Sequence, residues 1–313
     1  NFFFMFNISK IFRYKLYKLC TIKFSIIEKE EISSDGTIKW LFKISENNYV
    51  ESVFIPEKNR GTLCLSSQIG CFFNCSFCNT GFHGFSRNLY SSEIISQLYV
   101  VRKRLKYLYN KNVIYFFSVT NIVVMGMGEP LINFNNLSSF LLIIRDKFLY
   151  NFSKKCVTVS TSGVVPGMHD LFIYNDVSLA VSLHHVDDAL RTNLMPINKK
   201  YSINDLFRFF NLYKIISIDK ITIEYIMLRN INDYNCYAYE LIKLLNGNIY
   251  KINLIQFNVI KNFIFYPSFI EKIYFFQKIL KKSGIPVILR KIRGMDIKAS
   301  CGQLIGKFVK NKK

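Results

Sequence analysis

Residues 60–78 read RGTLCLSSQIGCFFNCSFC and hold the pattern that decides the fold. The apolar run from Thr62 to Ser67 predicts a buried strand, and the loop that follows it carries three cysteines. Cys71, Cys75 and Cys78 all fall within eight residues. We therefore expect a strand whose carboxyl end leads into a loop with metal or redox chemistry.

Predicted strands and helices alternate along the rest of the chain. Six more apolar runs predict strands, at residues 122–127, 157–160, 177–183, 221–228, 252–257 and 286–290. Helical spacing of apolar residues occurs between them, at residues 91–107, 136–150, 202–214, 235–245 and 268–283. Such alternation is typical of parallel βαβ units. Because the first strand is not followed by a glycine-rich dinucleotide turn, we predict an α/β fold with a partial, open β/α barrel.

Unusual residues follow four of the predicted strands. The cysteine cluster follows the first strand, and the other three segments are MGMGEP (125–130), STSG (160–163) and SLHH (182–185). In a barrel of parallel strands, the carboxyl ends of the strands meet on one face and carry the chemistry. We expect these four segments to form one site.

The barrel is expected to have an extension at each end of the chain. Residues 1–61 are interpreted as a small accessory module, in which Asp35-Gly36 between alternating residues predicts a β-hairpin. The barrel is predicted to span residues 62–295. Residues 296–313 form a carboxyl-terminal tail that carries Cys301.

The composition excludes some classes of protein. The 313 residues are 50% hydrophobic, which excludes a disordered or collagen-like chain, and the formal charge is +21. This charge favours a polyanion such as nucleic acid as partner, although drift toward Lys codons in an A+T-rich genome is an alternative explanation. No uncharged run is apolar enough to predict a membrane span, and the chain starts without an export signal. We expect a cytoplasmic protein.

The cysteine spacing leaves two kinds of metal site open. A structural zinc site needs four ligands, which Cys64 or His83 could complete. The alternative is a [4Fe-4S] cluster held by only three thiolates, so that one iron keeps an open position. That iron can chelate the amino and carboxylate groups of S-adenosylmethionine (SAM), and electron transfer to the sulfonium then yields a 5′-deoxyadenosyl radical. This spacing of three cysteines is the signature of the radical SAM enzymes.

The sequence around the cysteines resembles one family more closely, the bacterial dual-specificity RNA methyltransferases that methylate C2 of adenine. The resemblance runs from about Ser33 to Gly306. It is carried by SSDGTIKW (33–40), RGTLCLSSQIGC (60–71), VVMGMGEPLIN (123–133), VTVSTSGVVP (157–166), LAVSLH (179–184), MPINKKY (195–201), ITIEYIML (221–228), INLIQFN (252–258) and RGMDIKASCGQL (293–304). Members of this family usually carry a longer accessory domain before the SSDGTIKW hairpin, and this sequence begins without Met. We expect the truncated or eroded start to affect RNA docking more than the radical chemistry.

The resemblance implies a cofactor site. It places one [4Fe-4S] cluster on Cys71, Cys75 and Cys78 and implies two SAM molecules per turnover. The residues that it implies for SAM binding are Gly128, Glu129, Ser160, Ser182, Leu183, His184 and Asn258. Taken alone, Gly128 could be no more than a turn residue after a strand.

The resemblance also assigns catalytic roles to three residues. Cys301 is the methyl carrier, Cys64 releases the product by forming a disulfide with it, and Glu51 accepts the C2 proton. A solvated surface carboxylate is the alternative for Glu51. The transfer of the methyl group by way of Cys301 has a chemical reason. C2 of adenine is electron-poor and cannot attack the methyl of SAM, whereas a thiolate can. We interpret the three remaining cysteines as packing residues: Cys20, Cys156 and Cys236.

The substrates of the family that this sequence resembles imply the RNA partners of the protein. These are an adenosine in the peptidyl-transferase region of 23S ribosomal RNA and the adenosine beside the anticodon of some tRNAs. We also expect an electron donor such as flavodoxin or ferredoxin, and a monomer. The arginines that we predict to contact RNA phosphates are Arg60, Arg87, Arg290 and Arg293. Two alternatives stay open: the sister enzyme that methylates C8 of the ribosomal adenine, and a non-catalytic RNA-binding protein with a structural zinc.

Overall fold

One ten-stranded sheet forms the centre of the protein. The computed structural model describes residues 2–213, 221–245, 250–260 and 263–304, and the strand order is β1-β2-β3-β4-β7-β8-β9-β10-β11-β12. Neighbouring strands from β4 to β12 pair in parallel: β4 (Arg60–Cys64), β7 (Asn121–Val124), β8 (Val157–Thr161), β9 (Ser178–Ser182), β10 (Ile221–Met227), β11 (Lys251–Gln256) and β12 (Val287–Leu289). The seven predicted strands and the open α/β barrel are thus confirmed.

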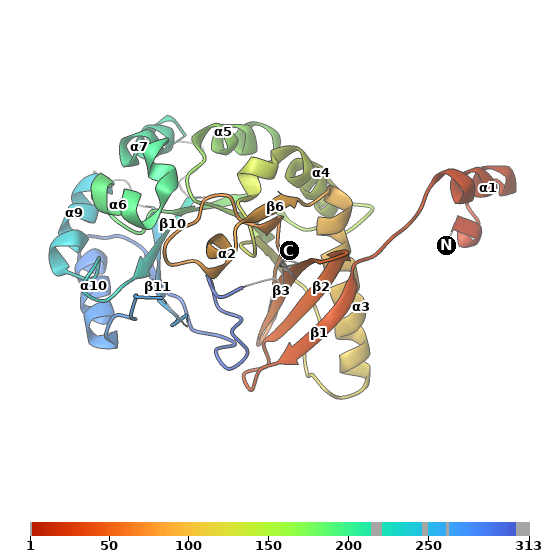
Figure 1. Ribbon diagram of the computed structural model, residues 1–313, viewed down its shortest axis with the longest axis horizontal. Helices are drawn as coiled ribbons and strands as arrows, with labels where there is room; N and C mark the ends of the chain where they lie inside the picture. Colours follow the sequence, from red (N-terminus) through yellow and green to blue (C-terminus); the bar gives the residue numbers. More distant parts are fainter. Residues whose placement is uncertain (1, 214–220, 246–249, 261–262, 305–313) are drawn as a thin grey trace, which may run out of the picture.

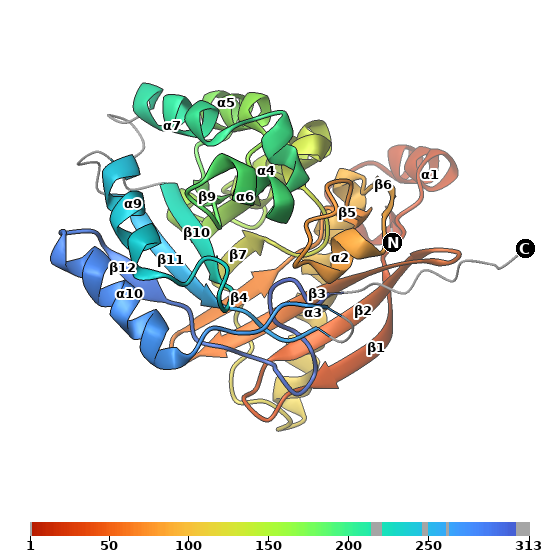
Figure 2. The same ribbon diagram turned by 60° about the vertical axis from the view of Figure 1, so that its left-hand side comes forward.

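Helices cover the outer side of the curved sheet (Figures 1 and 2). The five predicted helices are present with shifted ends: α3 (Ser91–Asn110), α4 (Phe134–Arg145), α7 (Ile203–Leu212), α9 (Asn235–Leu245) and α10 (Ile270–Lys282). The sequence did not predict α5 (Val165–Tyr174) or α6 (Asp188–Leu194). Pro166 and Gly167 mask the helical pattern of α5, and α6 has only seven residues, too few for a clear period.

The predicted hairpin is present and belongs to the same sheet. Strands β1 (Ile26–Ile32) and β2 (Ile38–Ser45) pair antiparallel, with Ile32 opposite Ile38. Gly36 in the turn has φ +83°, a conformation that glycine adopts without strain. Strand β3 (Asn48–Glu57) then joins β2 to β4, so the hairpin extends the barrel sheet rather than forming a sheet of its own. The division of the chain at residue 61 stays a prediction.

Helix α1 (Lys10–Leu19) lies to one side of the sheet (Figure 1), and none of its side chains is buried. The segment that follows it is anchored on α3, where the rings of Phe24 and Tyr99 stack at 4.3 Å between centroids. The N–H of Ser25 donates to Ser96 Oγ at 2.7 Å. Across the described ranges, every helix is too short or too polar to cross a membrane.

Candidate active site

The carboxyl ends of the parallel strands surround a cavity of about 150 Å³. Its lining includes five residues that the sequence singled out: Cys78, Ser160, Ser182, His184 and Cys301. Glu224 on β10 and Arg290 after β12 also line it. Asn258 and Cys301 line a smaller neighbouring cavity of about 40 Å³. The structure therefore brings residues from seven separate segments of the chain to one face of the barrel, as the parallel topology predicts.

The three cysteines of the loop lie close enough to influence one another. Burial raises the pKa of Cys71 to about 12, and the neighbouring Cys78 raises it further. The pKa of Cys75 is also raised, first by burial and then by Cys78 and Cys71. At Cys71, the backbone N–H groups of Phe72 and Phe73 donate hydrogen bonds to the sulfur, and these bonds lower its pKa against the effect of burial. The loop thus gathers three thiols around backbone donors.

The donor set fits a cluster held by three thiolates. Burial raises the pKa of Cys78 as well, while the N–H groups of Thr80 and Gly81 at the start of α2 (Asn79–Phe82) donate to its sulfur and lower it. Hydrogen bonds of this kind tune the thiolates of iron–sulfur clusters. Among the described residues, no group of three or more His, Cys, Asp and Glu side chains is arranged to hold a metal ion, so the thiols interact without converging on one point. His83, the other residue considered for zinc, is exposed.

Gly128 and Glu129 form a fixed corner after β7. Gly128 has φ +99°, and a Cβ there would lie 2.4 Å from Gln68 Cβ, so only glycine fits. Glu129 is buried, and burial raises its pKa. Its carboxylate accepts hydrogen bonds from Leu131 N–H (3.1 Å), Ser162 N–H (2.7 Å) and Ser162 Oγ (2.7 Å). The Thr161 side chain also hydrogen-bonds to it, and these donors oppose the effect of burial on its pKa. A buried carboxylate of this kind suits a ligand ammonium.

Segment 182–184 is held by its own backbone and by one histidine ring. The N–H of Leu183 donates to Glu224 O at 3.0 Å. His184 has φ +60°, and its Nδ1 accepts the Ile226 N–H at 3.1 Å. Burial, aided by the charge of Arg191, lowers the pKa of His184 to about 3. The ring is therefore neutral and engaged, which excludes it as a general base at neutral pH.

Asn258 follows β11 and lies at the edge of the site. Its Oδ1 is buried, and in the described part of the chain it has no hydrogen-bond partner. An unpaired buried carbonyl oxygen costs free energy unless a ligand or a water satisfies it. The oxygen therefore suits a ligand with hydroxyl or amine donors.

Cys301 lines the cavity, and Cys64 lies close enough to it for the two thiols to interact electrostatically. Burial raises the pKa of Cys64 to about 12, the nearby Cys301 adds to this, and the positive charge of Arg290 opposes it. The pKa of Arg290 is raised in return, chiefly by Cys301 and also by Glu224 and Cys64. Both cysteines are free thiols. The sequence separates them by more than two hundred residues, yet they share one arginine.

Backbone contacts fix the tail that carries Cys301. Gly302 O accepts the N–H of Asn79 at 2.8 Å, and Leu304 O accepts Thr80 Oγ1 at 2.7 Å. Both donors lie directly after the third cysteine of the loop. The methyl-carrier candidate is thereby held against the cluster loop.

Glu51 is buried on β3 instead of being a solvated carboxylate, with 8% of its surface exposed. Val53 pairs directly with Cys64 across β3 and β4, and Glu51 lies two residues along the strand. Side chains two residues apart point to the same side of a sheet, so Glu51 and Cys64 share one face. Glu51 Oε1 lies 3.3 Å from Lys39 Nζ.

Two expectations about the remaining cysteines were wrong, and some site residues were missed. Cys20 and Cys236 are exposed, so they do not pack in the core.

The sequence analysis also missed Ser162, which holds Glu129, and the buried Arg191. Ser162 could have been found, because it stands within STSG. A single Arg in a short helix carries no such signal.

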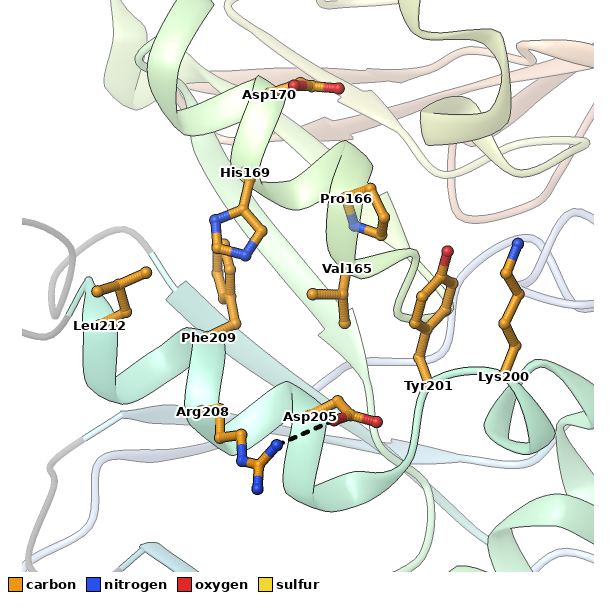
Figure 3. A pocket seen from close by; sticks show the side chains of 10 residues that line it. All are labelled: Val165, Pro166, His169, Asp170, Lys200, Tyr201, Asp205, Arg208, Phe209 and Leu212. Carbon is orange, nitrogen blue, oxygen red and sulfur yellow. Dashed lines mark ion pairs between the residues drawn. The ribbon is translucent and has the colours of Figure 1, made fainter.

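A shallower hollow lies between α5 and α7 (Figure 3), with a volume of about 670 Å³. His169 and Phe209 face each other there, with ring centroids 5.0 Å apart. Asp205 and Arg208 on α7 form an ion pair at 3.9 Å. None of the residues predicted for the site lines this hollow.

Comparison with known proteins agrees with this geometry. The family model described as Radical SAM superfamily matches residues 65–242. Proteins called dual-specificity RNA methyltransferase RlmN from Buchnera aphidicola subsp. Schizaphis graminum and from Wigglesworthia glossinidia brevipalpis are each 46% identical to the chain. The alignments cover 99% and 97% of this chain and 84% and 80% of those proteins.

A solved structure gives the same result. The crystal structure of a radical SAM methyltransferase from Sphaerobacter thermophilus superposes with a TM-score of 0.89 at 35% identity, over 98% of this chain and 89% of that chain. Both the sequence and the fold are thus shared over almost the whole chain. The chain belongs to the radical SAM superfamily and, within it, to the family of the dual-specificity RNA methyltransferases RlmN.

Proposed function

We propose that this radical SAM RNA methyltransferase methylates C2 of adenosine, in 23S ribosomal RNA and in some tRNAs, through an S-methylated Cys301. The observation that carries the proposal is that Cys64 interacts electrostatically with Cys301, and that Cys301 lines the same cavity as Cys78. A binding protein has no use for two free thiols at that point. A methyl carrier and a thiol that releases its product do need this arrangement.

The cofactors follow from the same residues. Cys71, Cys75 and Cys78 would hold one [4Fe-4S] cluster, which when bound supplies the electron that cleaves SAM to a 5′-deoxyadenosyl radical. The buried carboxylate of Glu129 suits the ammonium of SAM. The unpaired Oδ1 of Asn258 suits a hydroxyl or amine donor of the same ligand.

Two SAM molecules serve different purposes in this proposal. The thiolate of Cys301 attacks the methyl of the first, forming a C–S bond and releasing S-adenosylhomocysteine. A radical from the second removes one hydrogen atom from the S-methyl group, and the resulting carbon adds to C2 of adenine. The carboxylate of Glu51 then accepts the C2 proton, and the adduct would return its unpaired electron to a one-electron acceptor such as the oxidised cluster, so that the closed-shell adduct on Cys301 remains.

Product release uses Cys64. Its thiolate attacks the sulfur of Cys301, so that an S–S bond forms, the S–CH₂ bond breaks and the freed carbon takes up a proton. The new disulfide is reset by two electrons from a thiol reductant. The nearby charge of Arg290 favours the thiolate of Cys64 against the effect of burial.

The predicted phosphate contacts divide into two groups. Arg60, Arg290 and Arg293 line one cavity of about 420 Å³, together with Lys251 and Lys291. Five cationic side chains around one opening suit the phosphates of an RNA strand whose target base enters the barrel. Arg87 is different, because both of its terminal nitrogens bond to Glu93, at 2.7 and 2.8 Å. The ion pair of Arg60 with Glu57 is longer, at 3.4 Å, and more exposed. We now assign Arg87 to structure and keep the other three as RNA contacts.

A one-electron donor such as flavodoxin or ferredoxin is required by the chemistry. A cytoplasmic location and a monomeric state stay predictions.

The proposal is tested by incubating the reconstituted protein with SAM, reductant and unmodified ribosomal RNA or tRNA. Digested RNA is then analysed by mass spectrometry against standards of 2-methyladenosine and 8-methyladenosine. We expect 2-methyladenosine with wild-type protein and none with Cys301→Ala. Formation of 8-methyladenosine alone would assign the protein to the sister activity, and no methylated adenosine from either RNA would contradict the proposal.

A further inference from the structure

Arg191 is the largest charged side chain that is fully buried, with 0% of its surface exposed. It belongs to α6, which follows the SLHH segment after β9. Burying a guanidinium costs free energy unless its N–H groups are satisfied. The groups that bond to this guanidinium therefore indicate its role in the protein.

The guanidinium joins the ends of two strands. Its Nε donates to Leu183 O at 3.0 Å, and one terminal nitrogen donates to both Ser162 O and Ser182 O at 2.9 Å. The other terminal nitrogen donates to Asn198 Oδ1. These three carbonyls belong to the segments after β8 and β9 that would bind SAM. The planar fork of an arginine fixes all three with one side chain, which a lysine cannot do.

The backbone beside the guanidinium leaves little room for rearrangement. Gly163 has φ +112°, and a Cβ there would lie 3.3 Å from a terminal nitrogen of Arg191 and 3.0 Å from Leu206. The segment after β8 thus closes over the guanidinium. A change in Arg191 will be transmitted directly to this segment.

The same helix also holds the cysteine loop. Ser76 N–H donates to Leu194 O at the end of α6, at 3.0 Å. Ser76 directly follows Cys75, so the helix that carries the buried charge of Arg191 lies beside the part of the loop that bears this thiol. All four hydrogen-bond acceptors of the guanidinium are neutral. The carboxylate of Asp188 offsets its charge only from a distance, through Asn198, whose amide donates to Asp188 Oδ1 at 2.8 Å.

We propose that Arg191 is a positioning residue with two separable effects: its fork aligns the carbonyls of the SAM-binding strand ends, and its charge stabilises the reduced cluster on the cysteine loop. The proposal rests on the proposed function, since both effects concern SAM and the cluster. A buried positive charge beside a cluster ligand favours the state with one more electron, and so raises the reduction potential.

Two substitutions separate the effects. Arg191→Lys keeps the charge and loses the fork, whereas Arg191→Met removes both at similar volume. We expect Arg191→Lys to bind SAM about tenfold more weakly, as the loss of aligned hydrogen bonds predicts, with a cluster potential close to that of wild type. We expect Arg191→Met to bind SAM at least as weakly and to shift the potential to more negative values.

The measurements are calorimetric binding of SAM to the anaerobic protein and redox titration followed by paramagnetic resonance. Arg208→Met, on the exposed face of α7, is the matched control and should change neither value. Thermal unfolding of the protein without cluster identifies variants that fail to fold. If Arg191→Met fails, Arg191→Gln replaces it, because its amide can still donate to one of the carbonyls.

The outcomes are distinct from those for the proposed function. Tight SAM binding by Arg191→Lys overturns the alignment effect, and an unchanged potential in the folded neutral variant overturns the charge effect. A purely structural role predicts lower stability in the variants without a shift of potential. If wild-type protein itself holds no cluster, the proposed function fails first.

Discussion

Ser33 Oγ donates a 2.6 Å hydrogen bond to Asp296 Oδ1 and so joins the hairpin turn to the tail that carries Cys301. The Ser34 N–H donates to the other oxygen of Asp296 at 3.1 Å. Asp35 in the same turn accepts the Gly294 N–H at 2.9 Å. The turn after β1 therefore fixes the start of the tail, and the contacts at Asn79 and Thr80 fix Gly302 and Leu304.

This clamp predicts the effect of Asp296→Ala. The variant should transfer the methyl from SAM to Cys301 about tenfold more slowly, because the thiol loses its fixed approach to the methyl. Binding of SAM should change little, because the residues proposed to bind it lie elsewhere. The rate of S-methylation of Cys301, followed by mass spectrometry of the tryptic peptide, checks this. Asp176→Ala, at an exposed ion pair, is the control, and equal rates for the two variants would contradict the clamp.

Cys64→Ala and Cys301→Ala should fail at different steps. Cys301→Ala cannot carry a methyl group and should leave RNA unchanged. Cys64→Ala should become methylated on Cys301 and then retain the RNA as a covalent adduct, because the thiol that releases it is missing. Denaturing gels with labelled RNA distinguish the two. Free methylated RNA produced by Cys64→Ala over many turnovers would show that Cys64 has another role.

Gly128→Ala should destabilise the protein more than a glycine replacement at a positive φ with open space around it. The added Cβ meets both strain at φ +99° and the side chain of Gln68 at 2.4 Å. We expect a loss of roughly 2–4 kcal/mol in the free energy of unfolding. Gly284→Ala, at φ +77° with nothing within 4 Å, isolates the strain alone and should cost about 1 kcal/mol. Chemical denaturation of both proteins measures the difference, and equal losses would exclude the clash.

His184 predicts a specific dependence of stability on pH. Its folded-state pKa is lowered from 6.5 to about 3, by burial and then by Arg191. Between these values the unfolded chain binds more protons, so stability falls as the pH is lowered from about 6.5 toward 3. The contribution of this group is at most about 1.4 kcal/mol per pH unit.

His184→Asn tests that dependence, because asparagine tolerates positive φ and can accept the Ile226 N–H. The free energy of unfolding, measured by urea denaturation at pH 5 and pH 7, should differ less for the variant than for wild type. His185, whose pKa burial also lowers, remains in both proteins and cancels in the comparison. An identical pH difference in both proteins would contradict the assignment.

Much of the fold was predictable, because each barrel strand is a continuous apolar run between polar segments. The segments that hold the cluster cysteines, Glu129 and Ser160 could be placed at the carboxyl ends of predicted strands, while the roles of these residues came from the family resemblance and stay predictions. Contacts between distant segments could not be found in this way. The bond from Ser33 to Asp296 spans 263 residues, and no local pattern marks either partner.

Arg191 shows why a local pattern can mislead. In the segment DALRTNL it has the spacing of an ordinary residue on a short polar helix, where arginines are mostly exposed. Its burial arises from the carbonyls at two strand ends, which only the tertiary structure brings together. The exposed Cys20 is the opposite case, because cysteine is usually buried and this one lies at the end of α1, away from the sheet.

The central claim is a three-thiolate cluster that binds SAM, and paramagnetic resonance of the anaerobically reconstituted protein tests it most directly. Spectra of the reduced protein are recorded with and without SAM, for wild type and for Cys75→Ala. We predict a reduced [4Fe-4S] signal that changes when SAM is added and is absent in Cys75→Ala. A colourless wild-type protein that binds one zinc through Cys71, Cys75 and Cys78 would contradict the account.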